Sequence, residues 1–270
     1  MQGAKERLVA ARAAERIFAR DASFFCDDPE VLAAVADRLG WVGLPPKLSK
    51  DAERLSTLAT TLLGDDTEVV LLLGMGGSSL APLVLSEVLG PAEGFPALVV
   101  LDTVNPVTVT ECLEWLNPAR TLVVMSSKSG GTVEPNTLYA LVRHEFDEVL
   151  GVDQAGKRFV AITDPGSSLE AMGREAGFAH IELAAPDVGG RFSALTPFGM
   201  LPAALMGADI AALAYRAGQA EFACIQPGDD NPAVMLASAL ANAAAQGHWL
   251  PTIDTDEGLE GFGLWMEQVV

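Results

Sequence analysis

Short apolar runs alternate with helix-like segments through the middle of this 270-residue chain, and this alternation restricts the possible folds. The apolar runs predict strands at residues 69–73, 97–101, 121–125, 159–162 and 180–183. A strand that is apolar along its whole length is buried on both faces of its sheet. Alternation of such strands with helices favours a parallel sheet that helices cover on both sides. The sequence therefore predicts an α/β fold in three layers, an α/β/α sandwich.

Two further segments flank this alternating region, which spans residues 51–188. Residues 1–50 predict an N-terminal helical segment that ends at Pro45-Pro46. Residues 189–270 predict a linker and an incomplete second α/β domain. The elements expected there are a helix at residues 232–245, a strand at 249–253 and a helix at 258–270. One strand cannot form a parallel sheet, so this strand either joins the edge of the first sheet or belongs to a longer protein.

The charge balance limits the partners of the chain. Its formal net charge is −19 at pH 7, which repels nucleic acid and anionic membrane surfaces. No apolar run approaches the roughly 18 residues of a membrane span, and the first residues lack the apolar core of a signal peptide. We therefore expect a cytoplasmic protein that binds neither nucleic acid nor membranes. If the ligand is an anion, local backbone amides and a few cations must hold it.

The first loop with chemical character follows the strand predicted at residues 69–73. It holds three glycines and two serines, namely Gly74, Gly76, Gly77, Ser78 and Ser79. The glycines let the backbone turn sharply and let a ligand approach, while the helix that starts near Ser78 directs its amides at that ligand. Gly74-x-Gly76, with Asp102 at the end of the next strand, also fits a dinucleotide site, but Ser79 occupies the position of the third glycine. A tight turn without a ligand is the third interpretation.

The second loop follows the strand predicted at residues 121–125. It places hydroxyls, a cation and glycine amides just before a helix, in the order Ser127, Lys128, Ser129, Gly130, Gly131 and Thr132. A hydroxyl-rich loop at a helix N-terminus with an adjacent lysine suits a phosphate monoester. A well-capped helix start is the alternative; it explains Thr132 and Pro135 but not the residues before them. The loop is not a P-loop, because its lysine precedes the glycines.

A third element is Gly189-Gly190-Arg191. The two glycines free the backbone, and Arg191 is a fixed cation in a chain with few of them. A guanidinium beside a substrate can stabilise a developing oxyanion. A surface arginine in a turn between domains is the alternative interpretation.

Four motifs in series resemble those of the phosphoglucose isomerase family. They are Gly74-Met75-Gly76-Gly77-Ser78, Ser127-Lys128-Ser129-Gly130-Gly131-Thr132-Val133-Glu134, Gly189-Gly190-Arg191-Phe192-Ser193 and Phe262-Gly263-Leu264-Trp265-Met266-Glu267-Gln268. Their order and spacing are similar to those of the family over nearly the whole chain. The opening of the chain, with the sequences FARD and DRLGW, looks most like the isomerase part of bacterial proteins that fuse a transaldolase to this enzyme.

The resemblance implies a sugar isomerase domain with a five-stranded parallel sheet. It also implies an aldose–ketose isomerase that interconverts glucose 6-phosphate and fructose 6-phosphate through an enediolate, in glycolysis and gluconeogenesis. Arg191 is implied to be catalytic by steadying the enediolate, and the implied substrate-binding residues are Gly77, Ser78, Ser127, Lys128, Ser129, Thr132 and Gln268. No metal or cofactor is expected, the ligand is a small sugar phosphate, and the full-length protein is expected to be a homodimer. The family often has a threonine where this chain has Pro135, so one phosphate contact is expected to be lost.

The resemblance further implies a glutamate, four positions after the residue matching Gln268, that moves the proton between C1 and C2. Because the printed sequence ends at Val270, we expect a C-terminally truncated chain that binds sugar phosphate but lacks the base. A non-catalytic sugar-phosphate-binding or regulatory domain is the alternative, although the acidic balance argues against a regulator that reads DNA. A dinucleotide-dependent oxidoreductase is the third possibility, and it leaves residues 127–132 unexplained.

Overall fold

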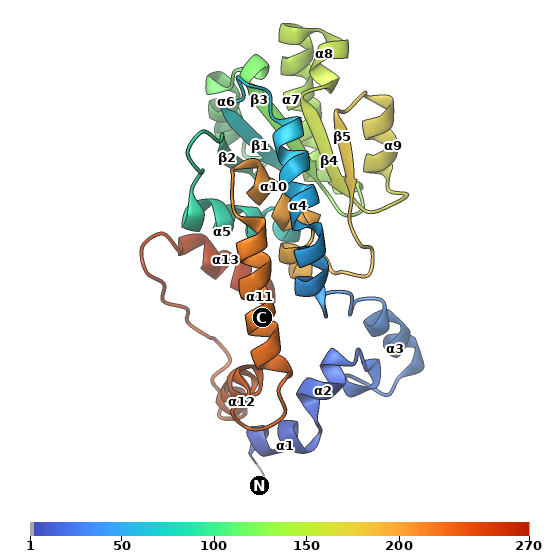
Figure 1. Ribbon diagram of the computed structural model, residues 1–270, viewed down its shortest axis with the longest axis vertical. Helices are drawn as coiled ribbons and strands as arrows, with labels where there is room; N and C mark the ends of the chain where they lie inside the picture. The colour runs from blue at the N-terminus through green and yellow to red at the C-terminus, as the bar shows by residue number, and fades with distance from the viewer. Residues whose placement is uncertain (1–2, 270) are drawn as a thin grey trace.

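The computed structural model describes residues 3–269 and shows a five-stranded parallel sheet at one end of the molecule (Figure 1). The strands are β1 (Val69–Leu73), β2 (Ala97–Leu101), β3 (Thr121–Ser126), β4 (Phe159–Thr163) and β5 (His180–Leu183). Their order across the sheet is β2-β1-β3-β4-β5, and every neighbouring pair is parallel. The chain therefore winds from β1 to β2 in one direction, and then from β3 to β5 in the other.

Helices connect the strands and extend the molecule beyond the sheet. Those that lie around the sheet are α4 (Leu44–Leu62), α5 (Leu80–Leu89), α6 (Pro106–Trp115), α7 (Val133–Leu150), α8 (Val152–Gly156), α9 (Ser168–Glu175) and α10 (Pro197–Leu205). The remaining α-helices are α1 (Ala4–Ala10), α2 (Ala13–Phe18), α3 (Pro29–Ala36), α11 (Ile210–Ile225), α12 (Pro232–Ala245) and α13 (Glu260–Val269). Among residues 3–269, no helix is long and apolar enough to cross a membrane.

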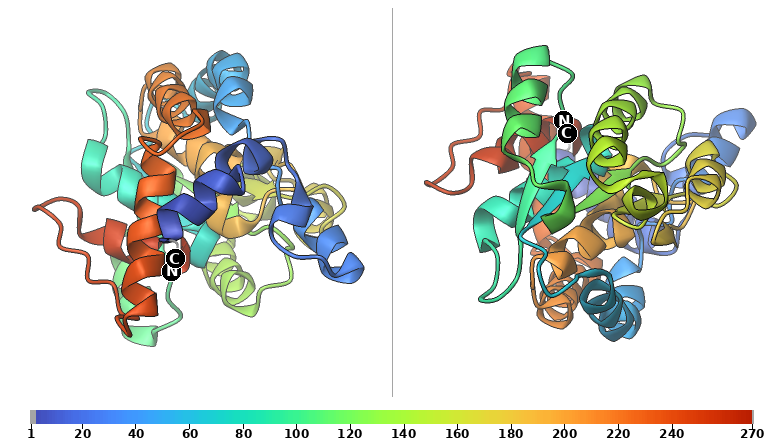
Figure 2. Two further views of the ribbon diagram at one scale, coloured as in Figure 1. Left: turned by 90° about the horizontal axis from the view of Figure 1, so that it is seen from below. Right: turned by 90° about the horizontal axis from the view of Figure 1, so that it is seen from above.

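Two apolar cores lie on opposite faces of the sheet, because successive side chains of a strand point to opposite faces. Val70 and Leu72 of β1 pack in the core that α4 and α10 complete. Leu71 and Leu73 pack in the core that α6 and α7 complete. Figure 2 (right) shows the sheet between these two helical layers. The predicted three-layer α/β/α fold is confirmed, and each predicted strand agrees with the observed one to within one residue.

The helix α4 begins earlier than the sequence pattern indicated. Pro45-Pro46 was expected to end the N-terminal segment, but these prolines lie in the first turn of α4, which starts at Leu44. The N–H groups of a first turn have no acceptor within the helix, so proline loses nothing by lacking one. The prolines therefore start a helix here rather than end a segment.

The strand expected at residues 249–253 does not form. This segment connects α12 to α13 without regular structure, and Leu250 is 92% exposed. A strand needs a neighbour for its backbone N–H and C=O groups, and the five-stranded sheet does not include this segment. In the described part of residues 189–270, the expected second α/β domain is therefore represented by helices alone. α10 packs on the sheet and α11 packs on α4, and the division of the chain at residues 50 and 188 stays a prediction.

An ion pair between half-exposed Arg54 and buried Glu182 joins α4 to the edge strand β5. Glu182 is 6% exposed, and its carboxylate accepts two hydrogen bonds from the Arg54 guanidinium, at 2.5 and 3.1 Å. His180 Nε2 lies 2.9 Å from the same carboxylate. Burial by itself raises the pKa of Glu182, but the hydrogen bonds to His180 and Arg54 outweigh burial and hold the pKa below its ordinary value. The ionised form of Glu182 therefore stabilises the folded state.

Replacing Glu182 with glutamine is expected to lower the free energy of unfolding by about 1–3 kcal/mol at neutral pH. Because the folded-state pKa is depressed, this contribution is fully present above the ordinary pKa of 4.5 and is lost as the pH falls below it. Urea denaturation should therefore show the difference between wild type and Glu182→Gln shrinking in acid. Glu53→Gln is the control. Glu53 lies at an exposed position of α4, next to Arg54, and its replacement should change the free energy of unfolding by less than about 0.5 kcal/mol. A difference that is equal at both pH values would contradict this interpretation.

Candidate functional site

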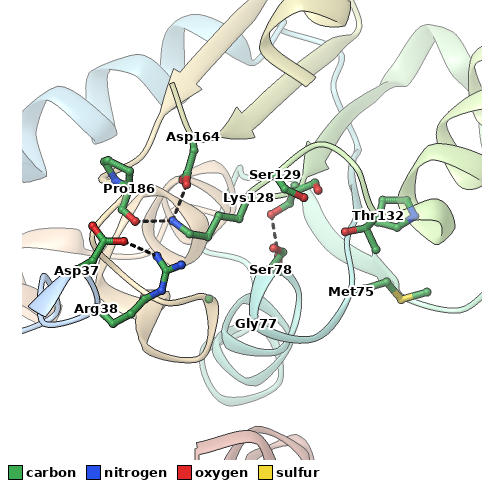
Figure 3. Close-up of a pocket in the computed structure, with 14 residues that line it drawn as sticks. Asp37, Arg38, Met75, Gly77, Ser78, Lys128, Ser129, Thr132, Asp164 and Pro186 are labelled. Carbon is green, nitrogen blue, oxygen red and sulfur yellow. Dashed lines mark hydrogen bonds and ion pairs between the residues drawn. The ribbon is translucent and has the colours of Figure 1, made fainter. Parts of the chain in front are cut away.

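The loops after β1 and β3 meet at the carboxyl edge of the sheet, where the direction of winding reverses. Ligands of open α/β sheets bind at this position, because the two loops leave the sheet on opposite sides and open a crevice between them. A pocket of about 620 Å³ lies there. The described residues that line it are Asp37, Arg38, Met75, Gly77, Ser78, Ser126, Ser127, Lys128, Ser129, Thr132, Pro135, Asp164, Pro186 and Gly190 (Figure 3). All three loops singled out in the sequence therefore contribute to one cavity.

The N-terminus of α7 borders this pocket without a side-chain cap. Thr132 occupies the N-cap position, but its side chain makes no capping hydrogen bond. The N-cap side chains of α6, α9, α10, α11 and α12 each accept a hydrogen bond from the first turn of their helix, whereas Ser79 at the N-cap of α5, like Thr132, does not. The first-turn amides of a helix carry partial positive charge and have no acceptor within the helix. An anion at Thr132 would supply that acceptor, so the interpretation of this loop as a merely well-capped helix start loses its support.

The three predicted hydroxyls of this loop differ in their contacts. Ser127 is buried, and its Oγ accepts a hydrogen bond from the Gly130 N–H at 3.2 Å. Ser129 is exposed, and its Oγ accepts one from the Gly131 N–H at 3.2 Å. A serine oxygen that accepts from an amide can still donate its own hydrogen to an anion. The structure therefore brings Ser127, Ser129 and Thr132 together in a loop whose shape its own hydrogen bonds maintain.

The loop after β1 touches the loop of Gly190 and Arg191 through the backbone. A Cβ atom added at Gly77 would overlap the Gly190 carbonyl group and would lie 2.9 Å from the Arg191 nitrogen. Ser193 reinforces this approach, since its Oγ lies within hydrogen-bonding distance of the carbonyl oxygens of Gly77, at 3.1 Å, and Gly190, at 2.6 Å. The Arg191 backbone therefore lies beside Gly77 at the rim of the pocket, and the Arg191 side chain is exposed.

The loop after β1 is also tied to the end of β3. The Ser126 hydroxyl donates to the Ser78 carbonyl oxygen at 2.8 Å. Ser78 lines the pocket between the two loops. This bond joins the first predicted loop to the end of the strand that carries the second.

Helix α13 carries Gln268 to the same edge of the sheet. It packs on α5, where the Gly261 N–H donates to Glu87 Oε2 at 2.8 Å. The Gln268 amide reaches Gly76, because a Cβ atom added at Gly76 would lie 3.1 Å from Gln268 Oε1. The structure therefore places Gln268 beside the glycine loop, although the two are far apart in the sequence.

Lys128 lies in the pocket wall, but its ammonium group is engaged by protein atoms (Figure 3). Its Nζ donates to Asp164 Oδ2 at 2.5 Å and to the Pro186 carbonyl oxygen at 2.9 Å. The Asp164 N–H in turn donates to the Lys128 carbonyl oxygen at 3.1 Å. In this arrangement Lys128 fastens the loop after β3 to the loop after β4, and its direct contact with a phosphate stays a prediction.

The sequence analysis missed five polar or turn residues of the pocket, namely Asp37, Arg38, Ser126, Asp164 and Pro186. The sequence could have indicated Asp164 as a site residue, because it directly follows the run predicted as β4 and so lies at the carboxyl edge of the sheet with the other loops. Asp37 and Arg38 had no such signal, because they follow α3 in the N-terminal segment and reach the pocket only through tertiary contacts. Within residues 3–269, no group of three or more histidine, cysteine, aspartate or glutamate side chains is placed to hold a metal ion. The expected independence from metals and cofactors stays a prediction.

The sequence model of the phosphoglucose isomerase family matches residues 49–219, which is more than half of the chain. This chain belongs to the phosphoglucose isomerase family. A glucose-6-phosphate isomerase from Lactobacillus gasseri is 30% identical to it over 254 residues, which are 89% of this chain and 56% of that relative. One from a Synechococcus strain is 35% identical over 220 residues, which are 78% of this chain and 39% of that relative. Membership in the family displaces the dinucleotide interpretation of the loop after β1.

Solved structures show the same arrangement of sheet and helices. A hypothetical protein from Thermus thermophilus superposes with a TM-score of 0.77 at 28% identity, covering 97% of this chain and 59% of that protein. A glucose-6-phosphate isomerase from Chlamydia trachomatis superposes with a TM-score of 0.71 at 21% identity, covering 95% of this chain and 47% of that protein. The second likeness shows the phosphoglucose isomerase fold alone. The chain spans about half the length of the curated relatives that it matches.

Proposed function

We propose that this chain forms the sugar-phosphate-binding part of a glucose-6-phosphate isomerase, with glucose 6-phosphate and fructose 6-phosphate as its ligands. The observation that carries the proposal is the uncapped N-terminus of α7 in a pocket lined by Ser127, Ser129 and Thr132. A phosphate at this point would accept hydrogen bonds from first-turn amides and from hydroxyls. Membership in the phosphoglucose isomerase family supports a hexose phosphate as the ligand.

The pocket rim also supports roles in the isomerisation itself. Conversion of an aldose to a ketose passes through an enediolate, whose developing negative charge needs a nearby donor or cation. We assign this role to Arg191, because its backbone lies beside Gly77 and its side chain is exposed; a catalytic contact of this kind can form only once the substrate is bound. Gln268, beside Gly76, is assigned to hydrogen-bond the sugar. On the family relation, the whole protein is proposed to act in glycolysis and gluconeogenesis, as a homodimer and without a metal or cofactor.

One observation favours a second candidate, a domain that binds sugar phosphate without converting it. The reaction needs a base to remove the proton beside the carbonyl. Among the described residues that line the pocket, the carboxylates are Asp37 and Asp164, and each is in an ion pair, with Arg38 at 3.4 Å and Lys128 at 2.5 Å. A coupled assay with fructose 6-phosphate tests whether this chain itself converts its ligand. Turnover of about 1–10³ s⁻¹ would exclude the second candidate, whereas binding without turnover agrees with both a part of the isomerase that lacks the base and a domain that only binds.

Replacing Thr132 with alanine is expected to weaken glucose 6-phosphate binding about tenfold or more, because a hydrogen bond to a charged phosphate contributes about 1.5–3 kcal/mol. Isothermal titration calorimetry measures the effect. Thr137→Ala is the matched control, since Thr137 lies on the same helix and its Oγ donates to the Val133 carbonyl oxygen at 2.9 Å. The control should bind within about twofold of wild type. Wild-type affinity in Thr132→Ala would exclude Thr132 as a phosphate ligand, and a wild-type chain that binds no sugar phosphate would refute the proposed function.

A further inference from the structure

The N-terminal segment brings a cation to the pocket. Arg38 follows α3 and lines the pocket together with Asp37. A guanidinium nitrogen of Arg38 lies 3.4 Å from the Asp37 carboxylate, and the two side chains are 58% and 69% exposed. An exposed ion pair of this kind contributes little to stability. A ligand can therefore recruit the Arg38 side chain at a small cost in free energy.

Contacts between remote parts of the chain hold Arg38 in place. The next residue, Leu39, forms an antiparallel bridge with Val188. Trp41 stacks on Phe192, with ring centroids 5.5 Å apart. The backbone after Arg38 therefore runs beside the segment that includes Gly190 and Arg191. The position of Arg38 at the pocket is thus fixed by its neighbours, while its exposed side chain keeps freedom to turn.

Among the described charged residues of the pocket, Arg38 is the cation that is available to contact an anionic ligand. The other cation among the described lining residues is Lys128, which Asp164 and the Pro186 carbonyl oxygen already hold. The chain has a net charge of −19, and its overall field opposes an anionic ligand. A cation that can turn into the pocket therefore matters more here than it would in a neutral protein.

Arg38 lies at the end of the pocket opposite Thr132. In Figure 3, Asp37 and Arg38 stand at one end of the row of labelled residues and Thr132 and Met75 at the other, with Ser78 between them. If the phosphate group of a hexose phosphate lies at Thr132, the part of the pocket between Thr132 and Arg38 is available to its sugar. A guanidinium presents N–H donors in a planar fork, which suits the oxygens of two adjacent sugar hydroxyls.

We propose that Arg38 hydrogen-bonds the sugar part of a bound hexose phosphate and so selects this ligand over smaller phosphates. The proposal rests on the proposed function, because it places the phosphate at α7. The N-terminal segment is then part of the binding site and determines specificity, in addition to covering the fold.

Calorimetric titration of Arg38→Gln with glucose 6-phosphate, and competition by inorganic phosphate, test the proposal. We expect glucose 6-phosphate to bind about tenfold more weakly, while inorganic phosphate, which fills only the α7 end, keeps its affinity within about twofold. Arg38→Lys should recover only part of the loss, because lysine restores the charge but not the fork. Arg7→Gln, at an exposed position of α1 remote from the sheet, removes the same charge and is expected to bind like wild type (Figure 1).

Each other outcome overturns part of the interpretation. Unchanged binding of glucose 6-phosphate by Arg38→Gln would show that Arg38 does not contact the sugar. Equal weakening of glucose 6-phosphate and inorganic phosphate would show that Arg38 acts on the phosphate through its charge, which also contradicts the proposal. Loss of binding in Thr132→Ala together with normal binding in Arg38→Gln would overturn this inference and leave the proposed function standing. Absence of binding in wild type would overturn both.

Discussion

Replacing Gly130 with alanine is expected to lower the free energy of unfolding by about 2–4 kcal/mol and to abolish measurable binding of glucose 6-phosphate. Gly130 has a φ of +71°, a conformation in which alanine costs about 1 kcal/mol. Its added Cβ would also overlap the Leu169 backbone nitrogen and would lie 2.7 Å from Ser168 Oγ, so the start of α9 would have to move. Such overpacking costs about 1–3 kcal/mol. Because Gly130 lies between Ser129 and Thr132, the same movement displaces the loop of residues 127–132, which we propose to bind the phosphate.

Gly177→Ala is the matched control for this substitution. Gly177 has a similar φ of +68°, but a Cβ atom added there would meet no atom within 4 Å. The control therefore carries only the backbone cost of about 1 kcal/mol and should bind glucose 6-phosphate normally. Urea denaturation and calorimetry provide the two measurements. Equal losses of stability in both variants would show that the close approach of Gly130 to α9 does not contribute to the effect. Normal binding by Gly130→Ala would show that the loop of residues 127–132 does not bind the phosphate.

Gly77→Ala is expected to weaken glucose 6-phosphate binding at least about tenfold, with a loss of about 1–3 kcal/mol in the free energy of unfolding. Its Cβ would overlap the Gly190 carbonyl group, which is backbone and has no other rotamer to adopt. The two loops must therefore separate, which breaks the paired contacts of Ser193 with Gly77 and Gly190. The separation also moves Arg191 away from the pocket, so the loss should be larger for the hexose phosphate than for inorganic phosphate.

Gly263→Ala controls for the glycine-to-alanine change itself. Gly263 lies within α13, where an added Cβ would meet no atom within 4 Å. Alanine favours a helix over glycine by about 1 kcal/mol, so this variant should be at least as stable as wild type and should bind normally. If Gly77→Ala retains the stability and the glucose 6-phosphate affinity of Gly263→Ala, the close approach of the two loops is not required for folding or for binding.

The strands could be predicted from the sequence because their signal is local. An apolar run such as Val69–Leu73 can be satisfied only by burial on both faces, and its neighbours along the chain supply the helices that bury it. The run at residues 249–253 shows where this reasoning fails. Its composition suits a strand, but a strand also needs hydrogen-bonding partners from another segment, and no local pattern guarantees them. The prediction that Pro45-Pro46 end the N-terminal segment was wrong for a related reason, since proline is compatible both with the end of one segment and with the first turn of a helix.

The residues of the site also fall into two groups, those that a local sequence pattern predicts and those whose contacts depend on distant segments. Ser127, Ser129 and Thr132 could be predicted because they follow one strand and precede one helix, so the loop that joins these elements already brings them together. The engagement of Lys128 could not be predicted, because its partners Asp164 and Pro186 come from other parts of the chain.

The sequence by itself determined the α/β class, the strands, the loops at the carboxyl edge of the sheet and the likeness to phosphoglucose isomerases. Each depends on neighbouring residues, whose periodicity and spacing express burial and turn geometry directly. Only the tertiary structure decided that the Lys128 ammonium braces two loops, that Gly77 touches Gly190, and that Arg38 reaches the pocket. These contacts join residues from separate elements, and their geometry follows from how the helices pack on the sheet, which no local pattern encodes.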